Sequence, residues 1–483
     1  MKTTLVAAGT LAVLVACGGG GSSSSMSQTG AQSVATWGTI TAFGSVYVNG
    51  VRYDVSRATL KKNDNVVVQT GLAVGEVALV RGREDTQTGQ GEADSVDVED
   101  SVVGPIKTID LVKNQLIVLG QTISVTADTS FGSGITADLK GLMTNDTIEV
   151  SGLPGTDGVI MATRISRAES TEPLQVLGTV ASVGAMNTLM INALTVDFSA
   201  ANVSGFASGK PAPGDLVIAR GTVFMDTTTT LTATALRLAD TDRDEQAAGG
   251  LVEEEGVITS VSPAASGMGN WDLVVAGAKV TTTASTVFKG GVATDLAVNV
   301  RVEVRGTLDA SKVLVADVVE IEHIAVIGLL GTASVTGTAL TVLGVPITVD
   351  ANTRFEDLSM AQVAMFTLTD VKDGDTVLVR GYESPAGSGT VLARRLERLP
   401  PPTVAGLAGV RGPFTPTTAP QFKILSINID ATSATFGKGE EGATLSSADF
   451  FTQAVGQIVD VVGIATGTTV MAKVALIDTE EDR

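Results

Sequence analysis

The chain has 483 residues, with 32 basic and 52 acidic side chains and a formal net charge of −20. Its length suits several domains, and its negative charge argues against nucleic acid as a partner, since such binding needs a positive surface. With one His and one Cys, the chain has too few ligands for a typical zinc site or a disulfide framework. We therefore expect no cofactor and no nucleic-acid partner.

The first sixteen residues have the pattern of an export signal. Lys2 is their only charge, and the apolar run at residues 5–16 is too short to cross a bilayer but suits a signal-peptide core. Cys17 follows directly, and residues 18–25 contain only Gly and Ser. This arrangement resembles the bacterial lipoprotein signal, which implies removal of residues 1–16 and acylation of Cys17, including by palmitate. An ordinary secretory signal with an incidental Cys is the alternative.

The resemblance predicts where the mature protein resides. Residues 17–36 would form a lipidated, flexible tether. Gly18 stands where an Asp often retains such proteins at the inner membrane. We therefore expect an outer-membrane lipoprotein of the cell envelope, facing the periplasm or the surface, whose membrane contact is the lipid on Cys17.

One short β-prone string recurs six times after the tether. Its first copy spans residues 77–82, and a Gly or Asn stands seven residues before its final Gly in every copy. Gly and Asn adopt positive φ at low cost, so a tight turn precedes each string. The residues two and four positions before the final Gly are always apolar, which indicates strands with one buried face. The final glycines are Gly82, Gly152, Gly221, Gly306, Gly381 and Gly463.

Each repeat also opens with a Gly before a β-prone stretch, as at Gly38, Gly104, Gly178, Gly256 and Gly328. A hairpin such as residues 47–53 follows in most copies. We predict an all-β chain of about six tandem small antiparallel β-barrel or sandwich modules, OB-like, with about five strands each. The modules are placed at residues 37–102, 103–170, 171–245, 246–325, 326–399 and 400–483.

Two arrangements of these modules are possible. Charged or proline-rich stretches at residues 240–250 and 399–402 suggest separators, so we expect beads on a string, each able to fold alone. One closed propeller is the alternative, although its blades usually have ~40–50 residues. An OB-like barrel would not bring nucleic-acid binding here, because that needs stacking aromatics in a basic groove.

The order of these signals resembles the bacterial domain-of-unknown-function family 5666. The shared features are the Gly-x-Ile opening, the hairpin around Gly, a middle Thr, Gly-Asp-x-Val-x-Val-x-Gly and Ala-x-x-Val. The resemblance covers most of residues 37–480 and is clearest in the first, second and fifth repeats. The fourth repeat has Asn299-Val300 in place of Gly-Asp, and the sixth departs furthest. The resemblance implies no activity.

A repeated arginine is the main candidate for binding. Arg81, Arg220, Arg305 and Arg380 occupy the same position on the outer face of the recurring strand. Such a set could bind an anionic polymer through several modules at once. The alternative is that each arginine forms an ion pair on a solvated face or contacts the next module.

The acidic residues offer only a weak metal candidate. Asp240, Asp242 and Asp244 begin like a calcium loop, but Glu245 and Leu251 replace the Gly and the bidentate Glu that such a loop needs. A solvated linker is the alternative. The single His323 has no positioned Ser or Cys in the sequence around it and is expected to be a linker residue.

No catalytic motif appears, so no catalytic residue is expected. The sequence favours a non-catalytic cell-envelope lipoprotein that binds or spaces through several modules, with an envelope glycan or protein as partner. The alternative is an envelope hydrolase or a calcium-binding surface protein that uses acidic residues. A carboxylate-pair enzyme would need two acids facing one cleft.

Overall fold

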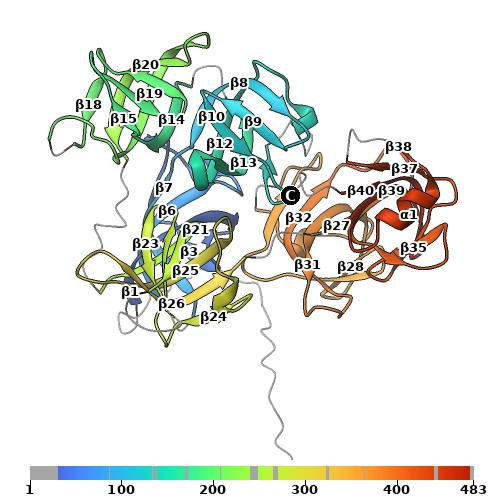
Figure 1. Ribbon diagram of the computed structural model, residues 1–483. Helices are drawn as coiled ribbons and strands as arrows, with labels where there is room; N and C mark the ends of the chain where they lie inside the picture. Colours follow the sequence, from blue (N-terminus) through green and yellow to red (C-terminus); the bar gives the residue numbers. More distant parts are fainter. Residues whose placement is uncertain are drawn as a thin grey trace, which may run out of the picture.

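The computed structural model describes most of the chain after residue 30. The described ranges are residues 31–85, 88–132, 135, 139–168, 172–206, 208–239, 249–264, 270–322, 326–363, 365–439 and 444–478. Within these ranges the chain is almost entirely β-strand, and no helix is long and apolar enough to cross a membrane. The strands form six small units, modules 1 to 6, which confirms the predicted all-β repeat fold (Figure 1).

Modules 1 and 4 share one sheet, although two other modules separate them in sequence. Residues 34–37 of β1 pair in parallel with residues 251–254 of β21. Module 1 contains β1 (Ala31–Ala42), β2 (Val46–Val48), β3 (Val51–Asp54), β4 (Thr59–Lys62), β5 (Asn65–Val66), β6 (Val77–Asp85) and β7 (Gln90–Val98). Module 4 contains β21 (Leu251–Pro263), β22 (Trp271–Val275), β23 (Ala278–Thr281), β24 (Val287–Lys289), β25 (Arg301–Leu308) and β26 (Leu314–Ile321).

Modules 2 and 3 share a second sheet, through an antiparallel contact between β8 and β14. Module 2 contains β8 (Val102–Asp110), β9 (Gln115–Val118), β10 (Gln121–Ser124), β11 (Ser130–Phe131), β12 (Thr147–Pro154) and β13 (Ile160–Arg167). Module 3 contains β14 (Leu174–Thr179), β15 (Ser182–Val183), β16 (Thr188–Ile191), β17 (Leu194–Asp197), β18 (Asn202–Ser204), β19 (Leu216–Met225) and β20 (Thr230–Leu238).

Modules 5 and 6 share the third sheet, in which β27 pairs antiparallel with β33. Module 5 contains β27 (Ile327–Thr336), β28 (Ala339–Val342), β29 (Val345–Thr348), β30 (Arg354–Asp357), β31 (Thr376–Glu383) and β32 (Val391–Leu399). Module 6 contains β33 (Leu407–Pro413), β34 (Thr415–Pro416), β35 (Gln421–Ile424), β36 (Ile427–Asp430), β37 (Thr435–Lys438), β38 (Thr444–Leu445), β39 (Ile458–Thr466) and β40 (Thr469–Ile477).

Short helices lie in the connections of the modules. The α-helix α1 (Ser447–Gln453) belongs to module 6, and its buried Phe450 packs beside Phe436, with ring centroids 4.8 Å apart. The remaining helical turns are 3-10 helices: η1 (Gln69–Gly71), η2 (Leu139–Gly141), η3 (Thr156–Gly158), η5 (Ala293–Asp295) and η6 (Leu368–Asp370).

Each module is built around a small barrel. In module 2, β8 pairs with β9 and β12, β9 with β10, and β13 with both β10 and β12, so the ring is closed. The β10–β13 pairing is parallel, which differs from the predicted fully antiparallel module. Every module repeats this parallel pairing. In each module a second, short strand also pairs in parallel with the last strand, as β11 does with β13.

The recurring string forms the fourth strand of each barrel, and its alternation is as predicted. The residues two and four positions before the final Gly, such as Val304 and Val302 in module 4, are fully buried in all six copies. Each final Gly lies at a shift in register next to the neighbouring strand. A Cβ atom there would lie 2.0 to 2.7 Å from a backbone oxygen of that strand. The repeat therefore requires Gly because two backbones approach too closely for any side chain.

The turn residue before this strand connects it to the opening strand. Gly75 has a φ of 91°, and its N–H donates to the carbonyl of Ile40, two residues after the opening Gly38. In module 5 the same bond joins Gly374 to Ala333, so Gly331 and not Gly328 occupies the opening position. The prediction that Gly328 opens the fifth repeat is wrong. Gly328 and Gly331 both precede a β-prone run, and the two are distinguished by the hydrogen bonds and strand register of the folded module.

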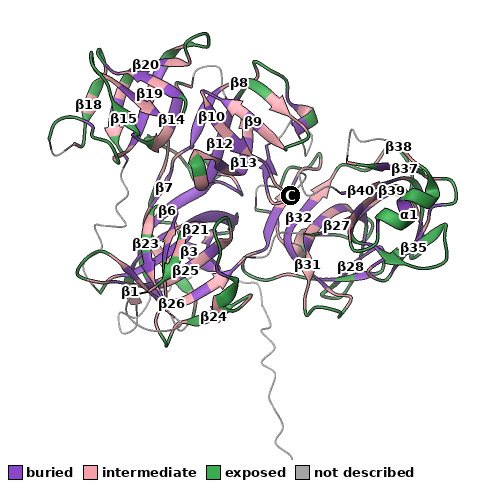
Figure 2. Ribbon diagram, viewed as in Figure 1, coloured by how far each residue is buried: buried purple, intermediate pink, exposed green. Residues whose placement is uncertain are grey.

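The modules are packed together and are not separate beads. Figure 1 shows modules 5 and 6 as one pair beside the other four, and modules 1, 2 and 4 meet at a small apolar cluster of Val77, Leu153 and Val257. Many residues at the module contacts are buried (Figure 2). The expectation of beads was wrong because the apolar and charged groups that join the modules lie far apart in sequence. The tether is also shorter than residues 17–36, since residues 31–36 pair with β6 as part of β1.

Candidate functional site

Several residues singled out from the sequence lie outside the described ranges. These are Cys17, His323 and the weak calcium candidates Asp240, Asp242 and Asp244. Within the described ranges, no group of three or more His, Cys, Asp or Glu side chains is placed to hold a metal ion.

The four repeated arginines, in contrast, are all described. Each directly precedes a final Gly, so each lies at the β-bulge. The extra residue of each bulge lies in the neighbouring strand, and the regular alternation places these arginines on the outer face of their own barrels. Arg81 pairs with Asp97 of its own module at 2.9 Å, whereas Arg220, Arg305 and Arg380 all reach into another module. The structure therefore does not bring the four together on one surface.

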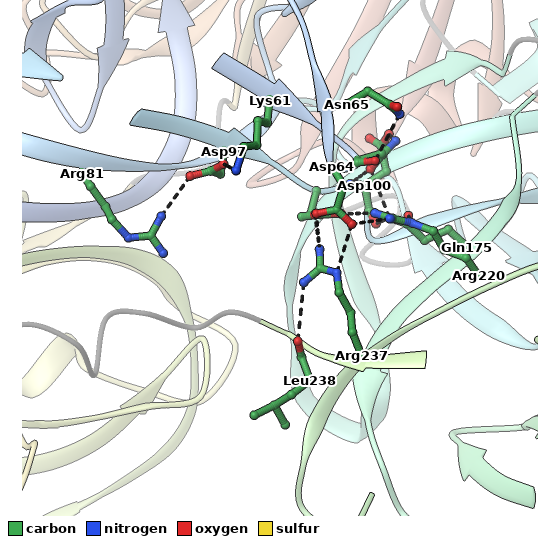
Figure 3. A network of polar contacts seen from close by, with 12 residues as sticks. Lys61, Asp64, Asn65, Arg81, Asp97, Asp100, Gln175, Arg220, Arg237 and Leu238 are labelled. Carbon is green, nitrogen blue, oxygen red and sulfur yellow. Dashed lines mark hydrogen bonds and ion pairs between the residues drawn. The ribbon is translucent and has the colours of Figure 1, made fainter. Parts of the chain in front are cut away.

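Arg220 belongs to a polar network between modules 3 and 1 (Figure 3). Its guanidinium donates to Asp64 and, at 3.0 Å, to Glu99, and Arg237 contacts the same two carboxylates. Gln175 accepts from Arg220 at 2.6 Å and donates to the Asp100 carbonyl at 2.7 Å. Burial raises the pKa of Glu99 to about 7, against the opposing effect of the two arginines.

Arg305 occupies the corresponding place between modules 4 and 1. It donates to Glu84 of module 1 at 2.9 Å and also to Glu253 of its own module. Both carboxylates are almost completely buried, with 0% and 1% of their surface exposed. Burial and the nearby Glu84 raise the pKa of Glu253 to about 8. One arginine thus serves two buried carboxyl groups at this interface, and its single charge balances one of them in the ionised form.

A lysine has the same role between modules 1 and 2. Lys62 Nζ lies 2.8 Å from Glu76, 2.7 Å from Glu149 and 3.8 Å from Asp100. Burial raises the pKa of both Glu149 and Asp100 to about 7. The sequence contains no signal for this cluster, because its members come from different elements and Lys62 and Asp100 lie outside the recurring strings.

Arg380 fixes module 5 to module 2 together with two neighbouring arginines. Arg354, Arg395 and Arg380 are in register on adjacent strands and donate to three successive carbonyls of module 2, those of residues 128, 129 and 127. The Arg380 bond to Ala127 is 2.6 Å long. Burial and the charges of Arg395 and Arg411 lower the pKa of Arg380.

Arg380 also lines a cleft of about 320 Å³ between modules 2, 5 and 6. In the sheet under this cleft, Arg380 is in register with Gly328, Gly328 with Arg411, and Arg411 with Asp460. Cross-strand partners share a face, so Gly328 separates the two arginines, and the Arg411 side chain lies close above it, 3.2 Å from where a Cβ atom of residue 328 would stand. Val125, Phe131 and Leu139 of module 2 form the opposite wall.

The two arginines of the cleft, Arg380 and Arg411, have different partners. Arg411 donates to Asp460 and to Asp478, each at 2.6 Å. Among the described residues, the Arg380 side chain donates one hydrogen bond, to the Ala127 carbonyl. Arg411 was missed in the sequence, although the Val410-Arg411-Gly412 string resembles the other arginine positions. Arg411 lies on β33, the first strand of module 6, whereas the other arginines lie on the fourth strand of their modules, and this difference is visible only in the fold.

Comparison with known proteins identifies one family. The model of the domain of unknown function (DUF5666) matches residues 103–166, 255–320 and 332–397, which correspond to modules 2, 4 and 5. Module 4 is matched despite Asn299-Val300 at its turn. No curated protein matches the chain.

Proposed function

Because this chain carries tandem repeats of the DUF5666 domain, we propose that it is a non-catalytic lipoprotein of the cell envelope in which six β modules form one rigid binding or spacing body. One observation carries this proposal: the repeated arginines are used to join modules and not to build a catalytic centre. Arg220, Arg305 and Arg380 each bond to a module other than their own.

The contacts between the modules favour a rigid arrangement of the six modules over a flexible one. Modules 1 and 4, modules 2 and 3, and modules 5 and 6 each share a continuous sheet. Buried acids such as Glu84 accept hydrogen bonds from cations of another module. Separating modules 1 and 4 would leave Glu84 without Arg305, and a buried charge that loses its partner is costly. The body is therefore suited to holding a binding surface at a fixed place relative to its anchor.

The anchor is the proposed lipid on Cys17. Thirteen residues lie between Cys17 and the start of β1 at Ala31. Fully extended, such a segment reaches at most ~45 Å, and a Gly/Ser-rich chain averages ~20 Å. The proposal thus places module 1 close to the membrane that holds the lipid, and a glycan or protein of the envelope is the expected partner.

Labelling cells with radioactive palmitate tests the anchor. The wild-type protein should carry label and sediment with membranes, whereas Cys17→Ser should lose the label. Cys17 is the only cysteine, so no other thiol can take its place. Equal labelling of the two proteins would contradict the lipoprotein assignment.

Sedimentation with purified peptidoglycan sacculi tests binding and catalysis together. We expect the mature protein to sediment with sacculi or to be retained by an envelope glycan array, with no soluble fragments released. Release of fragments at a rate that depends on protein concentration would show a hydrolase and contradict the non-catalytic proposal. If the protein is retained neither by sacculi nor by the glycan array, the binding role is contradicted for these ligands and the spacing role is what stays proposed.

A further inference from the structure

We propose that the cleft between modules 2, 5 and 6 binds a small monocarboxylate attached to an apolar group, such as the free carboxyl end of an apolar amino acid or peptide. Arg380 is the counterion for the carboxylate. The inference rests on the binding part of the proposed function and is independent of the lipid anchor.

The two arginines and two aspartates of the lining cancel in net charge, so the preference for an anion rests on the placement of Arg380. Arg411 contacts both Asp460 and Asp478, and Arg395 is paired with Glu397 in the layer beside it, whereas among the described residues no carboxylate lies within ion-pair distance of Arg380. Arg380 makes its described hydrogen bond to a neutral carbonyl, which uses one of the five N–H donors of a guanidinium. Its remaining donors can take a carboxylate in the two-bond geometry that suits arginine.

The electrostatics of Arg380 point the same way. Arg395 and Arg411 repel its charge, and burial removes it from water, so its charged form is disfavoured. A bound carboxylate would relieve both effects, because opposite charges attract more strongly where water is partly excluded. The net charge of −20 opposes anions at long range, but salt screens that repulsion over ~8 Å at physiological ionic strength.

The neighbouring acids limit the charge of the ligand. Asp460 and Asp478 line the same cleft as Arg380. A monoanion balances the single charge of Arg380, whereas a dianionic phosphate would leave one negative charge uncompensated beside these carboxylates. The geometry therefore favours a monocarboxylate over a phosphate.

The walls of the cleft account for the apolar group. Leu330 and Leu378 lie on the sheet beside Arg380, and Phe131 and Leu139 lie on module 2. Gly328 and Gly409 leave the sheet without side chains at two positions of the lining. A volume of about 320 Å³ is near the lower limit of ligand pockets, so a group the size of one amino-acid side chain is a suitable occupant.

Titration calorimetry on residues 18–483, the mature chain without its lipidated Cys17, tests the inference with four probes. N-acetyl-leucine carries both required groups, N-acetyl-leucinamide lacks the charge, acetate lacks the apolar group, and inorganic phosphate has the wrong charge. We expect N-acetyl-leucine to bind at least tenfold more tightly than each of the other three.

Two variants and a control connect binding to the cleft. Arg380→Gln removes the charge and should weaken N-acetyl-leucine binding at least tenfold, while Gln can still donate to Ala127. Leu378→Trp retains Arg380 but fills the cleft, and should abolish binding even if Arg380→Gln fails to fold. Arg81→Gln changes the equivalent arginine of module 1, outside the cleft, and should leave the affinity unchanged.

The inference is overturned if no probe binds, if the amide binds as well as the acid, or if Leu378→Trp binds like the wild type. Its failure is distinct from that of the proposed function. Sedimentation with sacculi in the absence of N-acetyl-leucine binding would contradict only the cleft assignment. Conversion of bound N-acetyl-leucine to leucine, followed by NMR, would support the cleft and contradict the non-catalytic role.

Discussion

Gly306 lies so close to Val315 of the neighbouring strand that a Cβ atom on Gly306 would stand 2.0 Å from the Val315 carbonyl oxygen. The five corresponding glycines have the same relationship to their neighbours. The contact explains why the repeat ends in Gly each time, and it links a sequence pattern to the shift in register between two neighbouring strands.

Gly306→Ala should therefore destabilise module 4 strongly. The strands must separate at the bulge, and forcing extra atoms into a packed site costs about 1–3 kcal/mol or more. Trp271 lies in β22 of the same module, so its fluorescence during urea unfolding, in a Trp37→Phe background, reports the change. Gly337→Ala is the control, because Gly337 has open space around it and a φ of 64°, for which a cost of about 1 kcal/mol is expected. Equal effects of the two variants would exclude steric contact as the reason for the repeated Gly.

Arg305→Met should weaken the contact between modules 1 and 4. It leaves Glu84 and Glu253 buried with no cation, and breaking a buried ion pair costs about 3–5 kcal/mol. Since Arg305 keeps about a quarter of its side-chain surface exposed, we expect a loss near the lower end. Urea unfolding measures it, and adding Glu84→Gln should restore part of the stability. The matched variant Arg81→Met loses a pair with Asp97, whose side chain is 25% exposed where Glu84 is fully buried, and should change stability by less than about 1 kcal/mol.

The buried acids predict that the protein is more stable at pH 5 than at pH 8. Glu253 has a folded pKa of about 8, and Glu99, Asp100 and Glu149 have pKa values of about 7, all raised by burial. Between their unfolded pKa values, near 4, and these folded values, the folded protein holds protons that the unfolded chain has lost. The free energy of unfolding must then fall as pH rises, by at most ~1.4 kcal/mol per pH unit for each group.

Thermal unfolding between pH 5 and pH 8 measures this dependence. Glu253→Gln removes one titrating group and should flatten the decrease in melting temperature. A melting temperature that rises steadily from pH 5 to pH 8 would show that these acids are ionised in the folded protein throughout the range.

Deleting residues 103–170 should destabilise the whole protein, contrary to the expectation from the sequence that each module folds alone. The deletion removes Glu149 from Lys62 and the carbonyl partners of Arg380 and Arg395, which lie in two interfaces, and it exposes the edge of β14 in a third. Deleting residues 400–483 removes the last module and breaks mainly one shared sheet edge. Circular dichroism melting of both shortened proteins should show a much larger loss for the first. Equal losses would restore the view of independent modules.

The number and nature of the modules follow from the sequence alone. The period of two in residues such as Val302 and Val304, the Gly or Asn at each tight turn and the Gly at each bulge depend on contacts within one strand or between adjacent strands. Such contacts recur at every repeat, so the pattern is visible without knowledge of the fold.

Only the tertiary structure decides how the modules are joined. The bond from Thr36 to Glu253 spans 217 residues, and the cleft combines Phe131, Arg380 and Asp460 from three modules. These contacts occur once each and have no period that a single sequence could display. The identical position of Arg81 and Arg305 in the repeat predicts one shared role, but their surroundings give them different partners. The reason is physical: local periodicity encodes a barrel, whereas the docking of barrels depends on side chains that meet only after each barrel has formed.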